Sequence, residues 1–222
     1  MGRWIPLDTA AGPVRAWLAQ PDKPPRGAVI VLQEIFGVNT HMRAVTDGFA
    51  ANGFVAMAPA LFDPVQPDTE LGYDEAGFAQ GREFVNALGT DRALQVIAAT
   101  ARWLHEAGHR PGVVGYCWGG TLAFLANTRL GLPAVSYYGA RTVPVLGEEL
   151  RAPMQFHFGG HDPSISAEDI QLHRELQPDA QLFVYAEAGH AFNRDVDPSH
   201  YHAASAALAR ERTLAFLAEH TS

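Results

Sequence analysis

The chain has 222 residues, of which 47% are hydrophobic and 18% charged, a composition typical of a folded globular protein of one domain. Its formal net charge is −8, and its single lysine and lack of basic runs argue against binding to nucleic acid or to anionic membranes. One cysteine permits no internal disulfide, and the N-terminal segment lacks the basic-then-apolar pattern of a secretion signal. No apolar run approaches the roughly 20 residues needed to cross a bilayer, so we expect a soluble cytoplasmic protein.

From residue 27 onward, short apolar runs typical of buried strands alternate with segments whose apolar residues recur at helical spacing. The expected strands fall within residues 27–37, 54–62, 111–117, 134–140, 152–162 and 180–190. The expected helices fall within residues 39–53, 90–108, 119–129, 166–177 and 199–220, whereas residues 64–90 show only a weak helical pattern. This order predicts a single α/β domain over residues 1–222, with a mostly parallel central sheet flanked by helices on both faces. Ligands of such sheets bind beyond the carboxyl ends of the strands, so residues at strand ends are the functional candidates.

The stretch Gly115-Tyr116-Cys117-Trp118-Gly119 places the only cysteine between an expected strand and an expected helix. This G-x-C-x-G pattern is that of a nucleophile elbow, whose glycines let a strained residue project its side chain. The start of the helix would favour thiolate over thiol, and the N–H of Trp118 would supply half of an oxyanion hole. The alternative is a buried structural cysteine beside glycines that serve only close packing. The position of the motif at a strand-to-helix junction favours the elbow.

Two further strand ends carry residues that would complete a catalytic triad. Asp162 follows one strand in GGHDP, and His190 follows another in EAGHAF. Nucleophile, acid and histidine then occur in the chain order of an α/β-hydrolase. His190 would accept the proton of the thiol or balance the charge of the thiolate, and Asp162 would fix the imidazole tautomer. Helix capping could explain Asp162 alone, and loop formation could explain His190 alone. Neither explains why Cys117, Asp162 and His190 all occur at strand ends in this order.

Other polar residues near strand ends admit structural explanations. Glu34 ends the first expected strand and, on spacing alone, is best explained as a solvated carboxylate. His157 and His161 lie on either side of a Gly-Gly turn without a third ligand, which argues against a metal site. Tyr138 of the SYYG stretch either lines the pocket or serves only packing and hydrogen bonding.

The motifs QEIFGVN, GYCWGG, FHFGGHDP and EAGHAFNR, with ALARERTLAFL near the C-terminus, resemble the dienelactone hydrolase family of α/β-hydrolases. The resemblance extends from about residue 28 to residue 217. It implies that Glu34 contacts the resting Cys117 and moves when an anionic substrate enters, whereupon the thiol loses its proton. It also implies that the N–H of Ile35 is the second oxyanion donor and that Arg194 binds a substrate carboxylate. For Arg194 the alternative is a surface arginine paired with a neighbouring aspartate.

Residues 64–90 depart from the family pattern. The family's second carboxylate-binding arginine comes from this segment, where Arg82 is the only arginine and is offset from the expected position. The aromatic residues of the family pocket have no clear match among Tyr73, Phe78 and Phe84. The catalytic core therefore matches the family better than the segment that would determine substrate specificity.

We expect a hydrolase that cleaves a small ester or lactone, as a carboxymethylenebutenolidase does, through an acyl-enzyme on Cys117 and without a metal or organic cofactor. An alternative within enzymes is a carboxylesterase or thioesterase of broad specificity. A third hypothesis is a non-hydrolytic, redox-sensing module that uses Cys117 as a sensor. Such a module would not need Asp162 behind a histidine.

Overall fold

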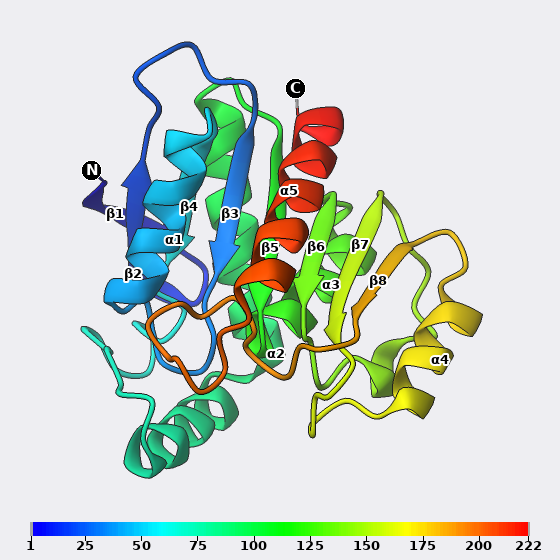
Figure 1. Ribbon diagram of the computed structural model, residues 1–222. Helices are drawn as coiled ribbons and strands as arrows, with labels where there is room; N and C mark the ends of the chain where they lie inside the picture. The colour runs from blue at the N-terminus through cyan, green and yellow to red at the C-terminus, as the bar shows by residue number, and fades with distance from the viewer. Residues whose placement is uncertain (1, 222) are drawn as a thin grey trace.

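The computed structural model describes residues 2–221 and contains an eight-stranded sheet with helices packed on both faces (Figure 1). The strands lie in the order β1-β2-β4-β3-β5-β6-β7-β8, antiparallel between β1, β2 and β4 and parallel from β4 to β8. Their bounds are β1 Arg3–Thr9, β2 Gly12–Ala19, β3 Ala28–Leu32, β4 Val55–Pro59, β5 Pro111–Tyr116, β6 Ala134–Tyr137, β7 Met154–Gly159 and β8 Gln181–Tyr185.

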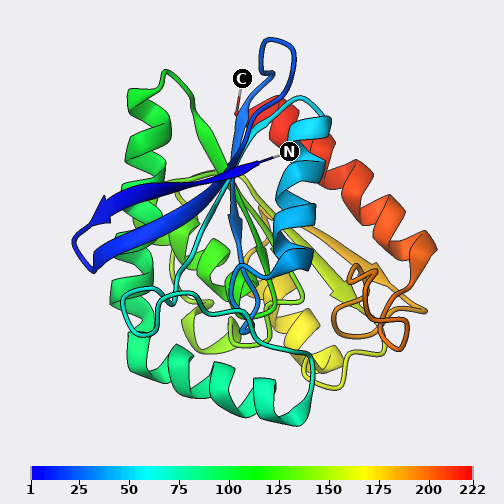
Figure 2. The ribbon, with the colours of Figure 1, turned by 90° about the vertical axis from the view of Figure 1, so that its left-hand side faces the viewer.

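The helices divide between the two faces of the sheet. Two views at right angles show α1 and α5 on one face and α2 and α3 on the other (Figures 1 and 2). Because helices cover both faces, β3, β4 and β5 are buried along their whole length, which explains their continuous apolar sequences. The bounds are α1 Thr40–Ala51, α2 Glu75–Glu106, α3 Trp118–Leu130, α4 Ala167–Leu176 and α5 Ala203–His220, with a short 3₁₀ helix, η1, at Val143–Val145.

The predicted alternation of strands and helices is confirmed from β3 to α5, and the chain forms a single α/β domain. Two features were not anticipated. The β1–β2 hairpin adds two antiparallel strands at one edge, and only one of the seven residues of β1 is fully buried, so its sequence lacks the apolar run of a buried strand. Helix α2 begins at Glu75 inside the segment with the weak pattern and is broken at Gly89, whose backbone (φ 71°, ψ 162°) favours glycine.

Residues 60–74, between β4 and α2, run beside the loop that follows β3. The N–H of Leu71 donates to the carbonyl oxygen of Phe36 at 2.9 Å, and Gly37 forms an isolated antiparallel bridge with Glu70. Gly37 has a φ of 81°, and a Cβ there would lie 2.0 Å from the carbonyl oxygen of Thr69, so only glycine fits this approach. This contact brings a segment distant in sequence to the carboxyl end of β3.

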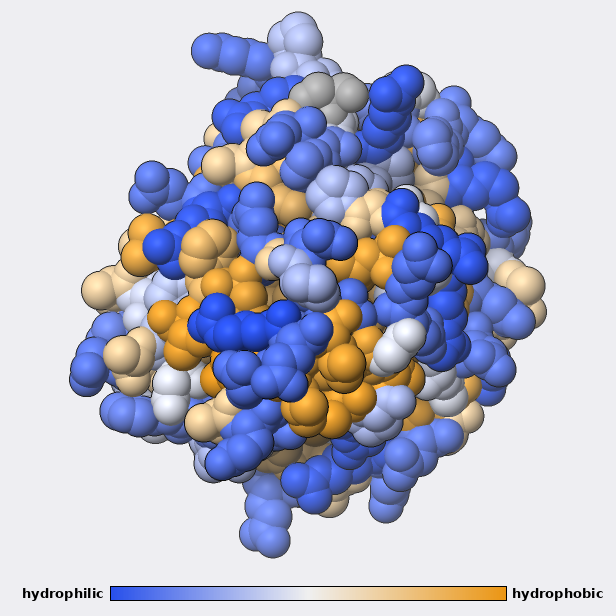
Figure 3. Space-filling model, turned by 90° about the vertical axis from the view of Figure 1, so that its right-hand side faces the viewer, coloured by the Kyte–Doolittle hydropathy of each residue, from blue (hydrophilic) through white to orange (hydrophobic). Residues whose placement is uncertain are grey.

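The opposite edge of the sheet ends at β8. Large apolar side chains are exposed there, and the view from that side shows apolar groups gathered near the middle of the surface (Figure 3). On the elements at this edge, Leu172 and Leu176 of α4 and Val184 of β8 are 37%, 52% and 38% exposed. No helix within residues 2–221 has the length and apolar character needed to span a membrane.

Candidate active site

Cys117 occupies a sharp turn between β5 and α3. Its backbone has φ 54° and ψ −117°, a conformation that is strained for a residue with a side chain. A Cβ on Gly115 would lie 1.8 Å from the carbonyl oxygen of Gly119, and one on Gly119 would lie 2.6 Å from that of Leu32. Both glycines are therefore required for α3 to approach the sheet closely. The partly exposed thiol stands at the start of α3, as the elbow motif predicts.

His190 lies between Cys117 and Asp162. Its Nδ1 is 2.7 Å from a carboxylate oxygen of Asp162, and Cys117 lies near enough to influence the pKa of its ring. The Asp162 side chain is completely buried, and its second oxygen accepts the N–H of Ser164 at 2.8 Å. The structure thus brings together the three residues that the sequence suggested as a triad.

These contacts change the proton affinity of His190. Burial alone would lower its pKa, but the hydrogen bonds and charges of Asp162 and Cys117 outweigh that effect and raise the pKa to about 10. At neutral pH the imidazole therefore carries a proton, so a cation stands beside Cys117.

Tyr138 lies behind His190 rather than at the surface of the pocket. It is 1% exposed, and its ring centroid is 4.9 Å from that of His190. Its hydroxyl donates to Oδ1 of Asn193, which lies on the loop after His190. Both Tyr138 (φ 40°) and Ala191 (φ 59°) adopt backbone conformations unusual for residues other than glycine. Packing and hydrogen bonding, one of the two roles considered for Tyr138, thus hold the histidine loop in place.

Ile35 follows β3 and Trp118 follows β5, at the carboxyl ends of two strands that pair in the sheet. Trp118 is the first residue of α3, where an N–H has no intrahelical acceptor, and its ring stacks on Phe62 at 5.4 Å. Ile35 is held from behind by α2, because a Cβ on Gly81 would lie 2.2 Å from the Ile35 carbonyl oxygen. That close contact fixes the backbone whose N–H is the predicted second oxyanion donor.

Glu34 and Arg194 form a buried pair of opposite charges. They are 2% exposed, and Glu34 Oε2 lies 3.9 Å from Arg194 Nε. Neither of those two atoms has a hydrogen-bond partner within residues 2–221, nor does Arg194 Nη1, which is 3.8 Å from Asp197. The solvated carboxylate and the surface arginine that sequence alone allowed are both wrong, because the fold buries both side chains. A buried guanidinium with two unused donors is suited to receive an anion.

Aromatic residues surround this pair. The Arg194 guanidinium lies 4.3 Å from the ring centroid of Tyr73 and 5.7 Å from that of Phe36. Asn39 Nδ2 donates to the Tyr73 hydroxyl at 3.1 Å, and burial, reinforced by the charge of Glu34, raises the Tyr73 pKa to about 12. Sequence analysis did not assign these roles. Phe36 lies in the QEIFGVN motif, but the position of Tyr73 depends on the long-range path of residues 60–74.

Comparison with known proteins agrees with this geometry. The model of the dienelactone hydrolase family matches residues 14–221. The chain belongs to the dienelactone hydrolase family. It is 37% identical over 216 residues to the carboxymethylenebutenolidase of Pseudomonas putida, and the alignment covers 91% of this chain and 90% of the Pseudomonas protein. A Yersinia pestis protein provisionally given the same name is 36% identical, and that alignment covers 92% of this chain and 83% of the Yersinia protein.

Solved structures show the same architecture. A Klebsiella pneumoniae protein provisionally named a dienelactone hydrolase superposes with a TM-score of 0.86 at 29% identity, covering 99% of each chain. The dienelactone hydrolase-like promiscuous phosphotriesterase P91 superposes with a TM-score of 0.76 at 20% identity, over 100% of this chain and 99% of its own, and shows the shared fold. This member of the dienelactone hydrolase family is accordingly a carboxymethylenebutenolidase-like hydrolase with the α/β-hydrolase fold.

Arg82, predicted to bind substrate, and His157, considered for a metal site and rejected, lie outside this cluster. Arg82 is exposed on α2, next to the Gly81 that packs on Ile35. His157 is buried, and its ring nitrogens bond to Tyr185 and Gln155 at 2.8 Å each. Burial lowers the pKa of His157 to about 3. In this family member, no group of three potential metal-ligating His, Cys, Asp or Glu residues occurs within residues 2–221.

Proposed function

We propose that this chain is a cytoplasmic hydrolase that cleaves a small ester or lactone through a Cys117 thiolate, with His190 and Asp162 as the rest of the triad. The supporting observation is the 2.7 Å hydrogen bond between His190 and Asp162, together with the position of Cys117 beside His190, where it helps to raise the pKa of the imidazole. The three residues come from loops after β5, β7 and β8, so a parallel sheet brings them to one edge.

In the first half of the reaction, the thiolate of Cys117 attacks the carbonyl carbon. The N–H groups of Ile35 and Trp118 stabilise the oxyanion that forms. The carbon–oxygen bond of the ester breaks, the leaving oxygen takes the proton of His190, and a thioester remains on the enzyme.

In the second half, water attacks the thioester and His190 accepts its proton as a general base. The carbon–sulfur bond then breaks and restores the thiolate. Forming the thioester removes the negative charge of Cys117, which is one of the influences that raise the pKa of His190. His190 therefore becomes a stronger acid once Cys117 is acylated, as suits a group that must release and accept a proton near neutral pH.

The Glu34–Arg194 pair supports an anionic substrate. A substrate carboxylate that enters the site would bind the unused Nε and Nη1 donors of Arg194 in competition with Glu34. The displaced Glu34 would then be free to remove the proton of Cys117. Reactivity would in this way depend on binding the correct substrate.

The test compares one anionic substrate with two neutral ones. The anionic substrate is an enol-lactone acid, and the neutral ones are its methyl ester, which has the same ring, and p-nitrophenyl acetate. Cys117→Ala should abolish turnover, and His190→Gln should lower kcat by roughly 10²-fold or more. His105→Gln is the matched control, because His105 lies exposed at the far end of α2.

The acid should be favoured over its methyl ester by about 10- to 100-fold in kcat/KM, the value of a charge-assisted hydrogen bond. Equal turnover of all three substrates would instead indicate the broad carboxylesterase or thioesterase, with Arg194 as a structural residue. A reactive thiol without any turnover would contradict the hydrolase and leave the redox-sensing alternative.

A further inference from the structure

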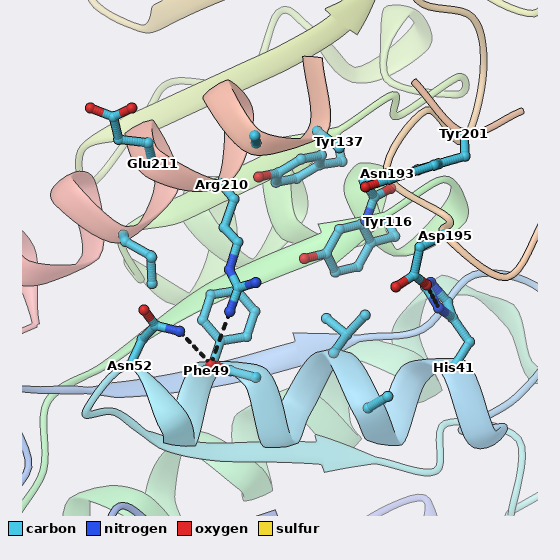
Figure 4. Close-up of a pocket in the computed structure, with 16 residues that line it drawn as sticks. His41, Phe49, Asn52, Tyr116, Tyr137, Asn193, Asp195, Tyr201, Arg210 and Glu211 are labelled. Carbon is cyan, nitrogen blue, oxygen red and sulfur yellow. Dashed lines mark hydrogen bonds and ion pairs between the residues drawn. The ribbon is translucent and has the colours of Figure 1, made fainter. Parts of the chain in front are cut away.

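A cleft of about 570 Å³ lies between α1 and α5, above the face of the sheet formed by β5 and β6. Figure 4 shows it as a trough with α1 along one side and α5 along the other. None of Cys117, Asp162 and His190 lines it. Its volume is in the range typical of sites for small organic ligands.

One end of the cleft holds a cation without an anionic partner. The Arg210 guanidinium donates to the carbonyl oxygen of Gly48 at 3.3 Å, an acceptor that Asn52 Nδ2 also uses at 2.7 Å. No carboxylate lies within ion-pair distance of Arg210 in the described chain, although the protein carries a net charge of −8. The neighbouring Glu211 side chain points away from Arg210 and from the trough (Figure 4). This end can therefore accept an anion.

The middle of the cleft is apolar but has one free hydroxyl. Tyr116 is 4% exposed, its hydroxyl has no hydrogen-bond partner within residues 2–221, and it points into the trough toward Arg210 (Figure 4). The hydroxyl therefore faces the cleft with both its donor and its acceptor capacity unused by the described protein. The surrounding walls are apolar and include Val45, Phe49, Ala206 and Leu214.

The other end of the cleft is polar and carries the negative charge of Asp195, because burial lowers the pKa of His41 and leaves its imidazole uncharged at neutral pH. His41 Nδ1 lies 3.2 Å from a carboxylate oxygen of Asp195, and Asn193 stands beside them (Figure 4). His41 and Gly48 are seven residues apart on α1, so the two ends are separated by about 10 Å along the helix. The cleft therefore offers a cation, an apolar span with one hydroxyl, and hydrogen-bonding groups in that order.

We propose that the α1–α5 cleft is a second binding site, distinct from the catalytic site, for an elongated organic anion with an aromatic or alkyl body. The carboxylate of the ligand binds Arg210 and the Tyr116 hydroxyl. Its apolar body lies between α1 and α5, and its far end reaches His41 and Asn193.

The experiment uses biphenyl-4-carboxylate, whose length suits this span, and the neutral biphenyl-4-carboxamide as the matched probe. Binding is measured by titration calorimetry on protein whose Cys117 has been alkylated with iodoacetamide, so that the catalytic thiol cannot react. Methyl NMR spectra locate the ligand, with Val45 and Leu214 reporting on the cleft. Leu122 reports on a smaller cavity of about 280 Å³ between α2 and α3.

The carboxylate should bind saturably, bind at least tenfold tighter than the carboxamide, and shift the Val45 and Leu214 methyl signals. Arg210→Met should weaken binding by about 10-fold or more, and Tyr116→Phe, which keeps the ring, by about 2- to 10-fold. Arg174→Met, an exposed arginine on α4, is the matched control and should leave the affinity unchanged.

The proposal is overturned by any of three results. The first is the absence of saturable binding at millimolar concentrations of biphenyl-4-carboxylate. The second is that the folded Arg210→Met and Tyr116→Phe variants bind the probe as tightly as the unmodified protein. The third is that only the methyl signals of Leu122 shift. Thermal melting establishes that each variant is folded, and the isosteric Tyr116→Phe variant keeps the test valid if Arg210→Met is unstable.

Discussion

Replacing Arg194 by methionine is expected to destabilise the fold more than the simultaneous replacement of Arg194 and Glu34. Both side chains are 2% exposed, and the recorded separation of their charged atoms is 3.9 Å. Coulomb's law with an effective dielectric constant of about 20 gives an attraction of roughly 4 kcal/mol at that distance. Arg194→Met leaves the Glu34 carboxylate buried without this cation, so the free energy of unfolding should fall by about 3–5 kcal/mol.

The double variant Glu34→Gln/Arg194→Met removes both charges and should unfold within about 1 kcal/mol of the unmodified protein. Glu34→Gln alone should cost less than Arg194→Met, because Asp197 remains 3.8 Å from Arg194 Nη1. The two substitutions should therefore be non-additive by at least about 2 kcal/mol.

Urea unfolding at pH 7, followed by tryptophan fluorescence, measures the four free energies of this cycle. Arg82→Met is the matched control, because Arg82 is exposed on α2 and its loss should change stability by less than about 0.5 kcal/mol. Additivity within about 0.5 kcal/mol would refute the argument, since it would mean that the two buried charges do not depend on each other.

Three further results are expected. Alkylating Cys117 removes a partner that raises the pKa of His190, so a histidine NMR titration should give a value below about 10, and an unchanged value would exclude the contact. Because the pKa of His190 is higher in the folded than in the unfolded chain, its protonation stabilises the fold fully below pH 6.5, roughly the pKa of an unfolded histidine, and this contribution is lost as the pH rises toward 10. Asp162→Asn should therefore make the free energy of unfolding depend less on pH between those two values. An unaltered pH dependence would contradict this explanation. Gly81→Ala places a Cβ 2.2 Å from the Ile35 carbonyl oxygen and should cost about 1–3 kcal/mol and lower kcat, whereas unimpaired kcat would show that Ile35 does not position the oxyanion.

The sequence was most informative where the sheet is buried on both sides. Strands such as β3 and β5 are continuous apolar runs, and a parallel sheet places their carboxyl ends at one edge. From that rule alone, Cys117, Asp162 and His190 could be expected to meet. The glycines around Cys117 made the elbow recognisable, because their spacing reflects a local steric requirement.

The sequence was least informative where the site depends on contacts between distant segments. Spacing favoured a solvated Glu34, whereas the fold buries it near Arg194. The packing of Tyr73 on Arg194 follows from the path of residues 60–74, which local pattern does not encode. Gly89 similarly divides α2 into two helical stretches, and only the second, after Gly89, has a clear helical pattern in the sequence.

The turn at Cys117 fixes where the reacting atom lies without depending on whether that atom is sulfur or oxygen. The bend is imposed by the backbone and by glycines 115 and 119, whose missing Cβ atoms admit neighbouring carbonyl groups, and not by sulfur. A hydroxyl could therefore replace the thiol without rebuilding the scaffold, although a hydroxyl would need a base to activate it. Since cysteine and serine codons differ by a single nucleotide, evolution can exchange one reaction chemistry for another here while keeping the same architecture.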